Sequence, residues 1–316
     1  MKVLVTGSSG QIGSFVCENL MREHEVIGLD LRDQPYDALK RISVKGDIRD
    51  PASVRSVVKG VGAVVHCAAQ VSVVKSTQDP LFDASSNVLG TVNMLTESAN
   101  AGVSKFIFIS SAAVFGNPNY IPIDENHPTN PLSNYGVSKL SGEKYAYAFS
   151  KNTRMQICSV RPFNCYSSRA DPESPYSGVI TKFFSRLRSG QPPVIEGDGK
   201  QTRDFIHSRD VAYLVELLVS KRWGSGEVFN CGTGVSTSIL ELANAAIRAS
   251  GKDLKPDEQL HPVSRHSSVV ARHLHRHLLG FASCDTEIRA SRRSGILGIL
   301  YSGWHRPAIP DPQRHR

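Results

Sequence analysis

The chain has 316 residues, of which 40% are hydrophobic and 21% charged, enough material for one large α/β domain or two closely joined ones. Its net charge of +8 would fit nucleic-acid binding, but the residues from 261 onward supply +6 of it, through nine Arg, no Lys and three acidic residues. No groove-reading motif accompanies this basic tail, so we do not expect a partner nucleic acid.

Membrane insertion, secretion and metal binding are not expected either. No apolar run approaches the roughly 20 residues that span a bilayer, and the opening MKVLVTG enters a strand rather than resembling a signal peptide. The six cysteines are scattered, with no CxxC pair and no histidine at ligand spacing. This usage indicates free thiols in a reducing cytoplasm.

The opening of the chain predicts a strand, a glycine turn, a helix and a second strand. KVLVTG is typical of a strand buried in a parallel sheet, and GSSGQIG follows it. Glycines at these positions (Gly7, Gly10 and Gly13) would let the backbone approach a pyrophosphate at the helix N-terminus. Asp30 ends the second strand, where a carboxylate can accept hydrogen bonds from the adenosine ribose. The unit predicts a dinucleotide site and favours NAD, although Arg32 nearby leaves NADP open.

Strands and helices continue to alternate along the chain. Further strands are expected at GDIRD (ending at 50), GAVVHCAAQ (62–70), KFIFISSAAVFG (105–116) and MQICSVRPFN (155–164), with helices over about 83–101 and 135–150. This alternation predicts an α/β fold of the Rossmann type, a doubly wound parallel sheet. Ligands of such sheets bind at the carboxyl ends of the strands, so those ends should meet at one crevice.

The stretch NYGVSKLSGE places Tyr135 four residues before Lys139, on one face of an expected helix. Both side chains are normally protonated at neutral pH. In a shielded cleft the ammonium would favour the phenolate, and the tyrosine could then act as a base. A core tyrosine beside a solvated lysine is the simpler explanation of an isolated YxxxK, so the surrounding motifs have to decide.

Ordered motifs from residue 1 to about residue 250 resemble those of the extended short-chain dehydrogenase/reductases that act on nucleotide sugars. They include TGSSGQIG, GDIRD, HCAAQVSV, NVLGTVNML, SSAAVFG, YGVSK, RPFN, GDGKQTRDFIHSRDVA and VFNCGTG. Within this family the chain is most similar to UDP-hexose 4-epimerases of the UDP-glucose/UDP-galactose and UDP-N-acetylhexosamine types. The resemblance implies an NAD-binding Rossmann domain over 1–165, to which the chain returns around 205–235. Residues 166–316 would mainly form a smaller C-terminal substrate-binding α/β subdomain.

The resemblance also implies a mechanism with three catalytic residues. Tyr135 would remove the proton of the sugar 4-hydroxyl while C4 passes hydride to the nicotinamide. Lys139 would hold the nicotinamide ribose and, with the cationic ring, lower the pKa of the tyrosine. Ser111 would bridge the sugar O4 and the tyrosine. The 4-keto intermediate would then rotate and take the hydride back on its other face, so that NAD returns to its starting state.

Ligand residues of the cofactor and the substrate follow from the same resemblance. The cofactor-binding residues would be Gly7, Gly10, Gln11, Ile12, Gly13, Asp30, Asp47, Ile48, Ala68, Ala69, Asn87, Ser110, Tyr135, Lys139 and Phe163. The residues that bind the UDP-sugar would be Lys75, Ser111, Asn164, Val179 and Arg203. Arg203 would contact the UDP phosphates, because guanidinium geometry suits bidentate binding. Relatives would dimerise through helices 83–101 and 135–150, which implies a cytoplasmic homodimer.

The choice among reactions of the family depends on the residues after Ser111. Hexose 4,6-dehydratases and UDP-glucuronate decarboxylases carry an acid just after the serine that matches Ser111, whereas this chain has Ala112 and Ala113. A methyl group cannot transfer a proton, so the pattern favours simple 4-epimerisation. Other reactions of the family remain open: a 4,6-dehydratase, a UDP-glucuronate decarboxylase, a sugar-nucleotide reductase or a UDP-uronate 4-epimerase. A catalytically impaired dinucleotide-binding member is the remaining alternative.

The tail from about residue 261 departs from the family pattern. The expected Arg-x-Gly-Asp is missing, and seven of the eleven histidines fall in this segment. A metal site made by His273, His275 and His277 is one explanation. We favour the hypothesis that the tail is out of register with the family, as a reading-frame shift near residue 269 would produce. The coding DNA would decide this, because an adjacent frame should then contain the family-like continuation.

Overall fold

The computed structural model of the chain describes residues 1–171 and 178–259. The atypical tail from 261, with its histidines, lies outside the described residues. A search of the described helices finds none with the length and apolar character needed to cross a membrane.

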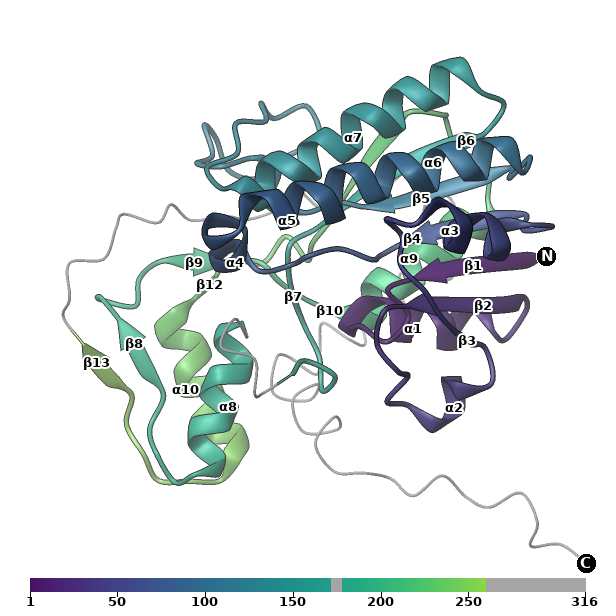
Figure 1. Cartoon of the computed structure of the whole chain (residues 1–316). Coiled ribbons are helices and arrows are strands. Elements are labelled where there is room, and N and C mark those ends of the chain that lie inside the picture. Colours follow the sequence, from purple (N-terminus) through teal and green to yellow (C-terminus); the bar gives the residue numbers. More distant parts are fainter. Residues whose placement is uncertain (172–177, 260–316) are drawn as a thin grey trace, which may run out of the picture.

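A seven-stranded sheet forms the centre of the molecule, in the order β11-β6-β5-β4-β1-β2-β3, with every neighbouring pair parallel (Figure 1). The strands are β1 (Lys2–Thr6), β2 (Glu25–Asp30), β3 (Ser43–Lys45), β4 (Ala63–His66), β5 (Lys105–Ile109), β6 (Gln156–Pro162) and β11 (Glu227–Cys231). β1 to β6 alternate with helices along the chain, which is the pattern of a doubly wound sheet. The Rossmann-type α/β fold expected from the sequence is confirmed.

Helices cover both faces of this sheet. One face packs against α1 (Gln11–Leu20) and α9 (Ser208–Ser220), and the other against α3 (Pro51–Val58), α6 (Gly90–Asn100) and α7 (Asn134–Asn152). Both apolar layers are almost fully buried, which explains why the strands read as continuous apolar runs. The last strand, β11, is added to β6 only after the chain has passed through α9.

A glycine lets α7 lie close to the sheet. A β-carbon on Gly142 would come within 2.5 Å of the ring of Phe108 in β5. Glycine is therefore required there because the aromatic ring fills the space that a larger residue would need. Close packing of α7 on β5 matters because the candidate catalytic residues Tyr135 and Lys139 lie on α7.

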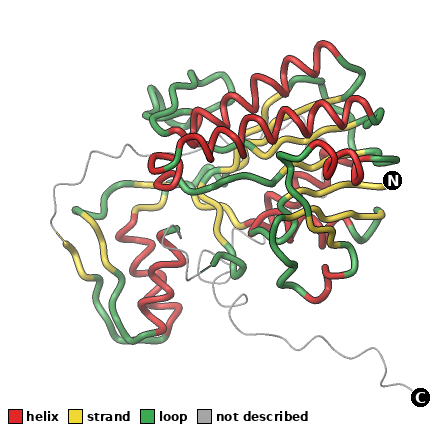
Figure 2. Tube along the Cα trace, in the orientation of Figure 1, coloured by secondary structure: helices red, strands yellow, loops and turns green. Residues whose placement is uncertain are grey.

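A second, smaller lobe follows the sixth strand (Figures 1 and 2). It contains α8 (Val179–Arg188), β8 (Val194–Glu196), β9 (Thr202–Arg203), β12 (Thr237–Ser238), α10 (Ile239–Ser250) and β13 (Asp257–Gln259). α8 and α10 bury Phe183, Phe184 and Leu242 against each other and against β8. The pair β7 (Asn164–Tyr166) and β10 (Phe205–His207) connects this lobe to the main sheet.

Short elements lie over the carboxyl ends of the strands or connect them. They are α2 (Asp37–Lys40), α4 (Val73–Gln78), α5 (Pro80–Ala84), a π-helical turn at Ser85–Leu89 and a 3-10 turn at Ala112–Val114. The helix expected over 83–101 is therefore built from α5, the π turn and α6. The π turn contains Asn87, whose side-chain amide donates to the Gln70 carbonyl and to Asp83. The change from α- to π-helical winding therefore points this polar side chain inward.

The expected third strand is the clearest boundary error. β3 ends at Lys45, and GDIRD lies beyond it. The reason is local side-chain bonding: Asp47 accepts the backbone N–H of Arg49, and Asp50 caps α3 by accepting from Ala52 and Ser53. These two carboxylates favour a turn and a helix start over continued strand pairing.

Candidate active site

The glycine loop after β1 packs closely against the backbone segments around it. Gly7 has φ +69°, and a β-carbon there would lie 2.7 Å from the backbone nitrogen of Ala68. A β-carbon on Gly13 would lie 2.2 Å from the Gly7 carbonyl oxygen, so α1 starts directly against the loop. Gly10 is the N-cap of α1 and gives its first turn no side-chain cap, which leaves N–H groups facing outward for an anion. The sequence prediction for these three glycines is consistent with this geometry.

Orphaned polar atoms test whether a dinucleotide fits this loop. The hydroxyls of Ser8, Ser9 and Ser14 are buried and have no hydrogen-bond partner among the described residues. Buried polar groups are normally paired, so these donors are available to a polar ligand. A pyrophosphate carries acceptor oxygens that such donors can bind, so the residues present fit NAD.

Asp30 lies at the end of β2, next to the loop. Its carboxylate accepts the backbone N–H of Ser9 at 3.0 Å and that of Arg32 at 2.9 Å. The guanidinium of Arg32 lies 3.7 Å from the same carboxylate and is largely exposed. The arrangement keeps an acceptor beside the glycine loop, where the sequence predicts the ribose of the cofactor.

The remaining candidate cofactor residues line the same edge of the sheet. Ala68 N–H donates to Thr6 Oγ1, and Asn87 exchanges bonds with the backbone of Gln70, so the segment after β4 that includes Ala69 is fixed. Asp47 is paired with Arg49, and Ile48 is buried against α6. Gln11 and Ile12 start α1, Ser110 ends β5, and Phe163 follows β6, so the topology brings these segments to one crevice.

Tyr135 and Ser111 come together where α7 begins beside the end of β5. A hydrogen bond from the Ser111 side chain lowers the pKa of Tyr135, and Ser111 Oγ also accepts the backbone N–H of Ala113 at 3.1 Å. The backbone N–H of Tyr135 donates to Ser76 in α4, which fixes the start of the helix. The two residues are 24 positions apart in the sequence, and the fold brings the Ser111 side chain near enough to Tyr135 to lower its pKa.

Lys139 lies one turn further along α7 and is only 3% exposed. Its Nζ donates to the carbonyl of Ile109 at 2.8 Å and lies 6.0 Å from the centre of the Tyr135 ring. Burial lowers the pKa of Lys139 to about 8, while Cys67, Asp83 and Glu143 act in the opposite direction. Because this pKa is close to neutral, a charge added nearby would change the protonation of Lys139.

The pKa of Tyr135 moves opposite to the sequence expectation. Burial raises it to about 12, and the hydrogen bond from Ser111 offsets only part of that rise. Lys139 donates to Ile109 rather than to the phenol, so it does not by itself produce a phenolate. Deprotonation near neutral pH needs further positive charge beside the ring, because an opposite charge favours the charged form of an acid.

Candidate substrate residues differ in how well the structure supports them. Asn164 starts β7, and its side chain donates to the carbonyl of Asp204 at 3.1 Å. Arg203 is half-buried in β9, and burial lowers its pKa. Val179 begins α8 and packs on the core of the second lobe. Lys75 lies apart on exposed α4, with its ammonium 4.5 Å from the ring centre of Phe82.

Asp204 is a residue of the second lobe that the sequence motifs did not single out. Its buried carboxylate accepts the backbone N–H groups of Thr233 and Gly234 and the Thr233 hydroxyl, at 2.6–2.9 Å. These bonds tie the strand that carries Arg203 to the loop after β11. An acid directly after a predicted phosphate-binding arginine was the available signal, but its partners are 29 and 30 residues away and only the fold reveals them.

The chain belongs to the NAD dependent epimerase/dehydratase family, which residues 3–232 match. It is an enzyme of this class, and NAD is its cofactor. The extended short-chain dehydrogenase/reductase resemblance of the sequence is thereby confirmed.

Individual relatives are named for sugar-nucleotide reactions. A putative UDP-glucose 4-epimerase of Methanocaldococcus jannaschii is 40% identical over 246 residues, which cover 76% of this chain and 79% of that protein. The crystal structure of UDP-glucose 4-epimerase with UDP-glucose from Thermotoga maritima superposes with a TM-score of 0.83 at 29% identity, covering 96% of this chain and 98% of that one. The dTDP-D-glucose 4,6-dehydratase of Bos taurus is 31% identical over 261 residues, covering 78% and 72% of the two chains.

Proposed function

We propose that this enzyme epimerises the 4-hydroxyl of a UDP-hexose, either UDP-glucose/UDP-galactose or UDP-N-acetylglucosamine/UDP-N-acetylgalactosamine. The observation that carries the proposal is that the turn after Ser111 packs against α7, which carries Tyr135 and Lys139, and that this turn begins with two methyl side chains, Ala112 and Ala113. A single proton-transfer group suffices for epimerisation at one carbon. The 4-epimerase names of the relatives support the same reaction.

Tyr135 is the proposed base. It takes the proton of the sugar 4-hydroxyl in one direction and returns it in the other, which is general acid–base catalysis at one oxygen. NAD, when bound, supplies the hydride acceptor and donor and a positive ring. Ser111 holds the sugar oxygen and the phenol in hydrogen-bond reach. Ser111 and Tyr135 are partly exposed, and a bound sugar that displaced the remaining water would strengthen each of these polar contacts.

Lys139 has a separate role in this proposal. Its ammonium, buried and bonded to Ile109, would donate to the cofactor ribose and favour the phenolate by charge. Residues 1–165, with the return segment 205–235, hold the cofactor. From 166 onward the chain mainly holds the UDP-sugar, with Arg203 at its phosphates.

Two competing functions are each favoured by a specific observation. The relative named dTDP-D-glucose 4,6-dehydratase favours a dehydratase reaction. Against it, Ala112 and Ala113 leave no acid directly after Ser111. The unusual tail from 261 favours an impaired enzyme that still binds NAD. Product identity separates the three, because they predict a 4-epimer, a 4-keto-6-deoxy sugar or no product.

The test is to incubate the protein with NAD and UDP-glucose or UDP-N-acetylglucosamine and to resolve the products by chromatography. We expect the 4-epimer, and Tyr135→Phe should lose turnover by roughly 10²- to 10⁴-fold while retaining NAD. Tyr147→Phe is the matched control, because Tyr147 is an exposed tyrosine of the same helix. Substantial residual activity in Tyr135→Phe would contradict the assigned base.

A cytoplasmic homodimer is the finer part of the proposal. Leu81, Leu89, Val137 and Tyr145 are exposed apolar or aromatic residues on α5, the π turn and α7. Apolar side chains concentrated on one set of helices favour a protein interface. Light scattering should give twice the chain mass, and charge substitutions at Leu89 and Val137 should convert the dimer to monomer.

A further inference from the structure

A buried polar network lies directly behind the candidate catalytic residues. Glu143 follows Lys139 by one turn and Tyr135 by two turns on α7. Its Oε1 accepts from Ser110 Oγ at 2.6 Å and from Arg161 Nε at 2.8 Å, and its Oε2 accepts from Arg161 Nη2 at 2.7 Å. All three members of the network are at most 5% exposed.

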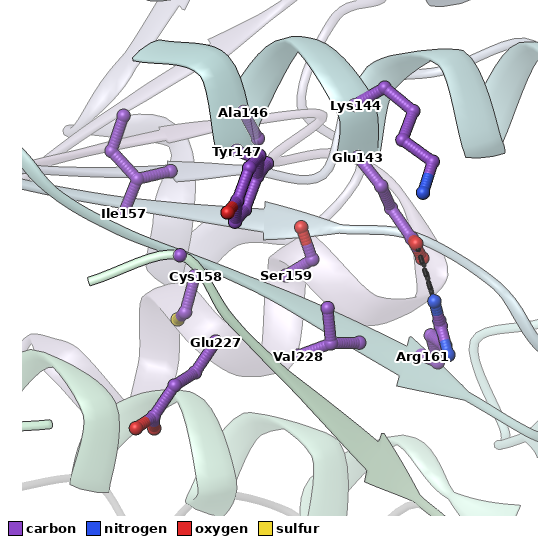
Figure 3. Close-up of a pocket in the computed structure, with 11 residues that line it drawn as sticks. Glu143, Lys144, Ala146, Tyr147, Ile157, Cys158, Ser159, Arg161, Glu227 and Val228 are labelled. Carbon is purple, nitrogen blue, oxygen red and sulfur yellow. Dashed lines mark hydrogen bonds and ion pairs between the residues drawn. The ribbon is translucent and has the colours of Figure 1, made fainter. Parts of the chain in front are cut away.

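Figure 3 shows the Glu143–Arg161 pair at one end of a pocket between α7, β6 and β11. The cavity is about 150 Å³, and Cys158 and Glu227 lie at its other end. The guanidinium also stacks 4.8 Å from the ring centre of Phe115, and its Nη1 has no partner among the described residues. The pocket extends from this pair along β6 to Ile157, away from the carboxyl end of that strand.

Stability alone is a weak reason for this network. A buried ion pair often contributes no more than well-packed apolar residues of the same volume, because both charges lose their hydration. Its distinctive property is directional bonding, since each bond fixes an angle and a distance that apolar packing would not. The bonds join three elements that meet at the site: the end of β5, the middle of α7 and the end of β6.

The connection to catalysis runs through neighbours in sequence. Ser110 precedes Ser111, so holding the Ser110 hydroxyl fixes the backbone that presents the Ser111 hydroxyl. Glu143 lies on the same helix as Tyr135 and Lys139. Its bonds therefore fix the position of α7 along its axis and its rotation about that axis. The Glu143 carboxylate also raises the pKa of Lys139, which supports the charged ammonium.

We propose that Glu143, held by Arg161 and bonded to Ser110, is a positioning residue that sets the register of α7 against the end of β5. The inference rests on the proposed function, because its purpose is to keep Ser111 and Tyr135 in hydrogen-bond reach. The Glu143 carboxylate bonds to Ser110 and Arg161, so its effect on the two catalytic hydroxyl groups is indirect. Misplacing catalytic groups by about 1 Å can lower a rate by about 100-fold.

The test uses two variants and one matched control. Ser110→Ala removes the bond to the end of β5 and leaves the ion pair intact, whereas Glu143→Gln removes the charge and keeps the shape. The Ser110 hydroxyl donates to Glu143, so a cofactor contact of Ser110 would come from its backbone, which Ser110→Ala keeps. Glu97→Gln is the control, because Glu97 also forms a bidentate pair with an arginine, Arg55, between α3 and α6 and away from the crevice. All three proteins are assayed with NAD bound, using the UDP-sugar that the wild type converts.

We expect kcat to fall by roughly 10- to 100-fold in Ser110→Ala and Glu143→Gln, with KM and bound NAD within about twofold of wild type. Glu97→Gln should keep the wild-type kcat. If both variants match Glu97→Gln in kcat, the proposal is wrong. A fall in NAD content equal to the fall in activity would also overturn it, because the network would then serve cofactor binding.

Amide hydrogen exchange gives a readout that does not need activity. In both variants exchange should quicken over 109–116 and 134–143 while β1 and β2 keep wild-type rates. Should the wild type convert no UDP-hexose, the proposed function fails, and this exchange pattern alone decides the positioning role. Unchanged exchange over both segments in Ser110→Ala, which retains the ion pair and its fold, would sink it.

Discussion

The backbone of Gly7 in the loop after β1 touches the backbone of Ala68 after β4 so closely that a β-carbon would lie 2.7 Å from the Ala68 nitrogen. The contact holds together the loops that follow β1 and β4, two neighbouring strands of the sheet. Gly7 also has φ +69°, a conformation that L residues adopt only at a cost. Any other residue at position 7 would therefore suffer both backbone strain and a steric clash with Ala68.

Replacing Gly7 by alanine should abolish tight NAD binding. We expect at least about a 100-fold weaker Kd by calorimetry, because the loop must move away from the position that accepts the pyrophosphate. Gly60→Ala separates the two causes, since Gly60 has φ +73° but nothing within 4 Å of an added β-carbon. That control should cost about 1–2 kcal/mol of stability and leave NAD affinity unchanged. Equal loss of affinity in both variants would contradict the steric explanation.

Lys105 caps the C-terminus of α9 from the neighbouring strand β5. Its Nζ donates to the carbonyls of Leu218, Val219 and Lys221, at 2.6–3.2 Å. Removing the ammonium takes one donor from each of these carbonyls, of which that of Leu218 keeps the indole N–H of Trp223, and removes a cation from the negative end of the helix. Lys105→Met should lower the free energy of unfolding by about 1–3 kcal/mol, measured by urea denaturation. Lys45→Met, which loses only the exposed pair with Asp33, should change it by less than about 1 kcal/mol.

His66 makes the fold sensitive to acid. Its hydrogen bonds fix one tautomer: Thr91 donates to the Asn87 carbonyl and so accepts from Nε2, while Nδ1 accepts from Thr6. Burial lowers the pKa of His66 from 6.5 to about 3. The unfolded chain therefore binds one more proton than the folded protein between these values, and stability is lost as the pH falls through that range.

Comparison with His66→Gln isolates this titration. Between pH 7.5 and 5 the wild type should lose about 2 kcal/mol of unfolding free energy more than the variant does, since each unit of pKa difference corresponds to about 1.4 kcal/mol. Other groups titrate equally in both proteins and cancel. Parallel pH profiles of the two proteins in urea denaturation would contradict this. They would show that His66 has the same pKa in the folded and the unfolded state.

Asp204→Asn should destabilise the second lobe. The carboxylate accepts from Thr233 with one oxygen and from the Gly234 N–H with the other, so an amide NH₂ at either position would face a donor. We expect a loss of about 1–3 kcal/mol of stability and a raised KM for the UDP-sugar, with NAD content unchanged. Asp198→Asn, an exposed carboxylate in the same lobe, should keep both wild-type values. A raised KM in Asp198→Asn as well would remove the specific role of Asp204.

Local spacing explains why much of the site was predictable. The four-residue interval between Tyr135 and Lys139 fixes their common helix face, and Asp30 must end a strand that pairs beside the glycine loop. Ser111 and Phe163 follow buried strands, so topology alone sends them to the same edge of the sheet. These predictions need no knowledge of side-chain packing.

Long-range pairing explains what was not predictable. The Glu143–Arg161 bond joins a helix to a strand, and its formation depends on how α7 packs over β5 through Gly142. The sequence did contain a signal, because Glu143 extends the four-residue spacing of Tyr135 and Lys139. The pKa of Tyr135 was also beyond reach, since it is dominated by burial, which a sequence pattern does not measure.

The late arrival of β11 has a consequence for synthesis of the chain on the ribosome. β6 pairs with β11, and Phe163 N–H donates to the Cys231 carbonyl, so the nascent sheet keeps an open edge until roughly seventy further residues have emerged. A ribosome-bound intermediate with that edge uncovered is a natural client for chaperones. Cotranslational crosslinking should therefore find them on chains that stop before α9.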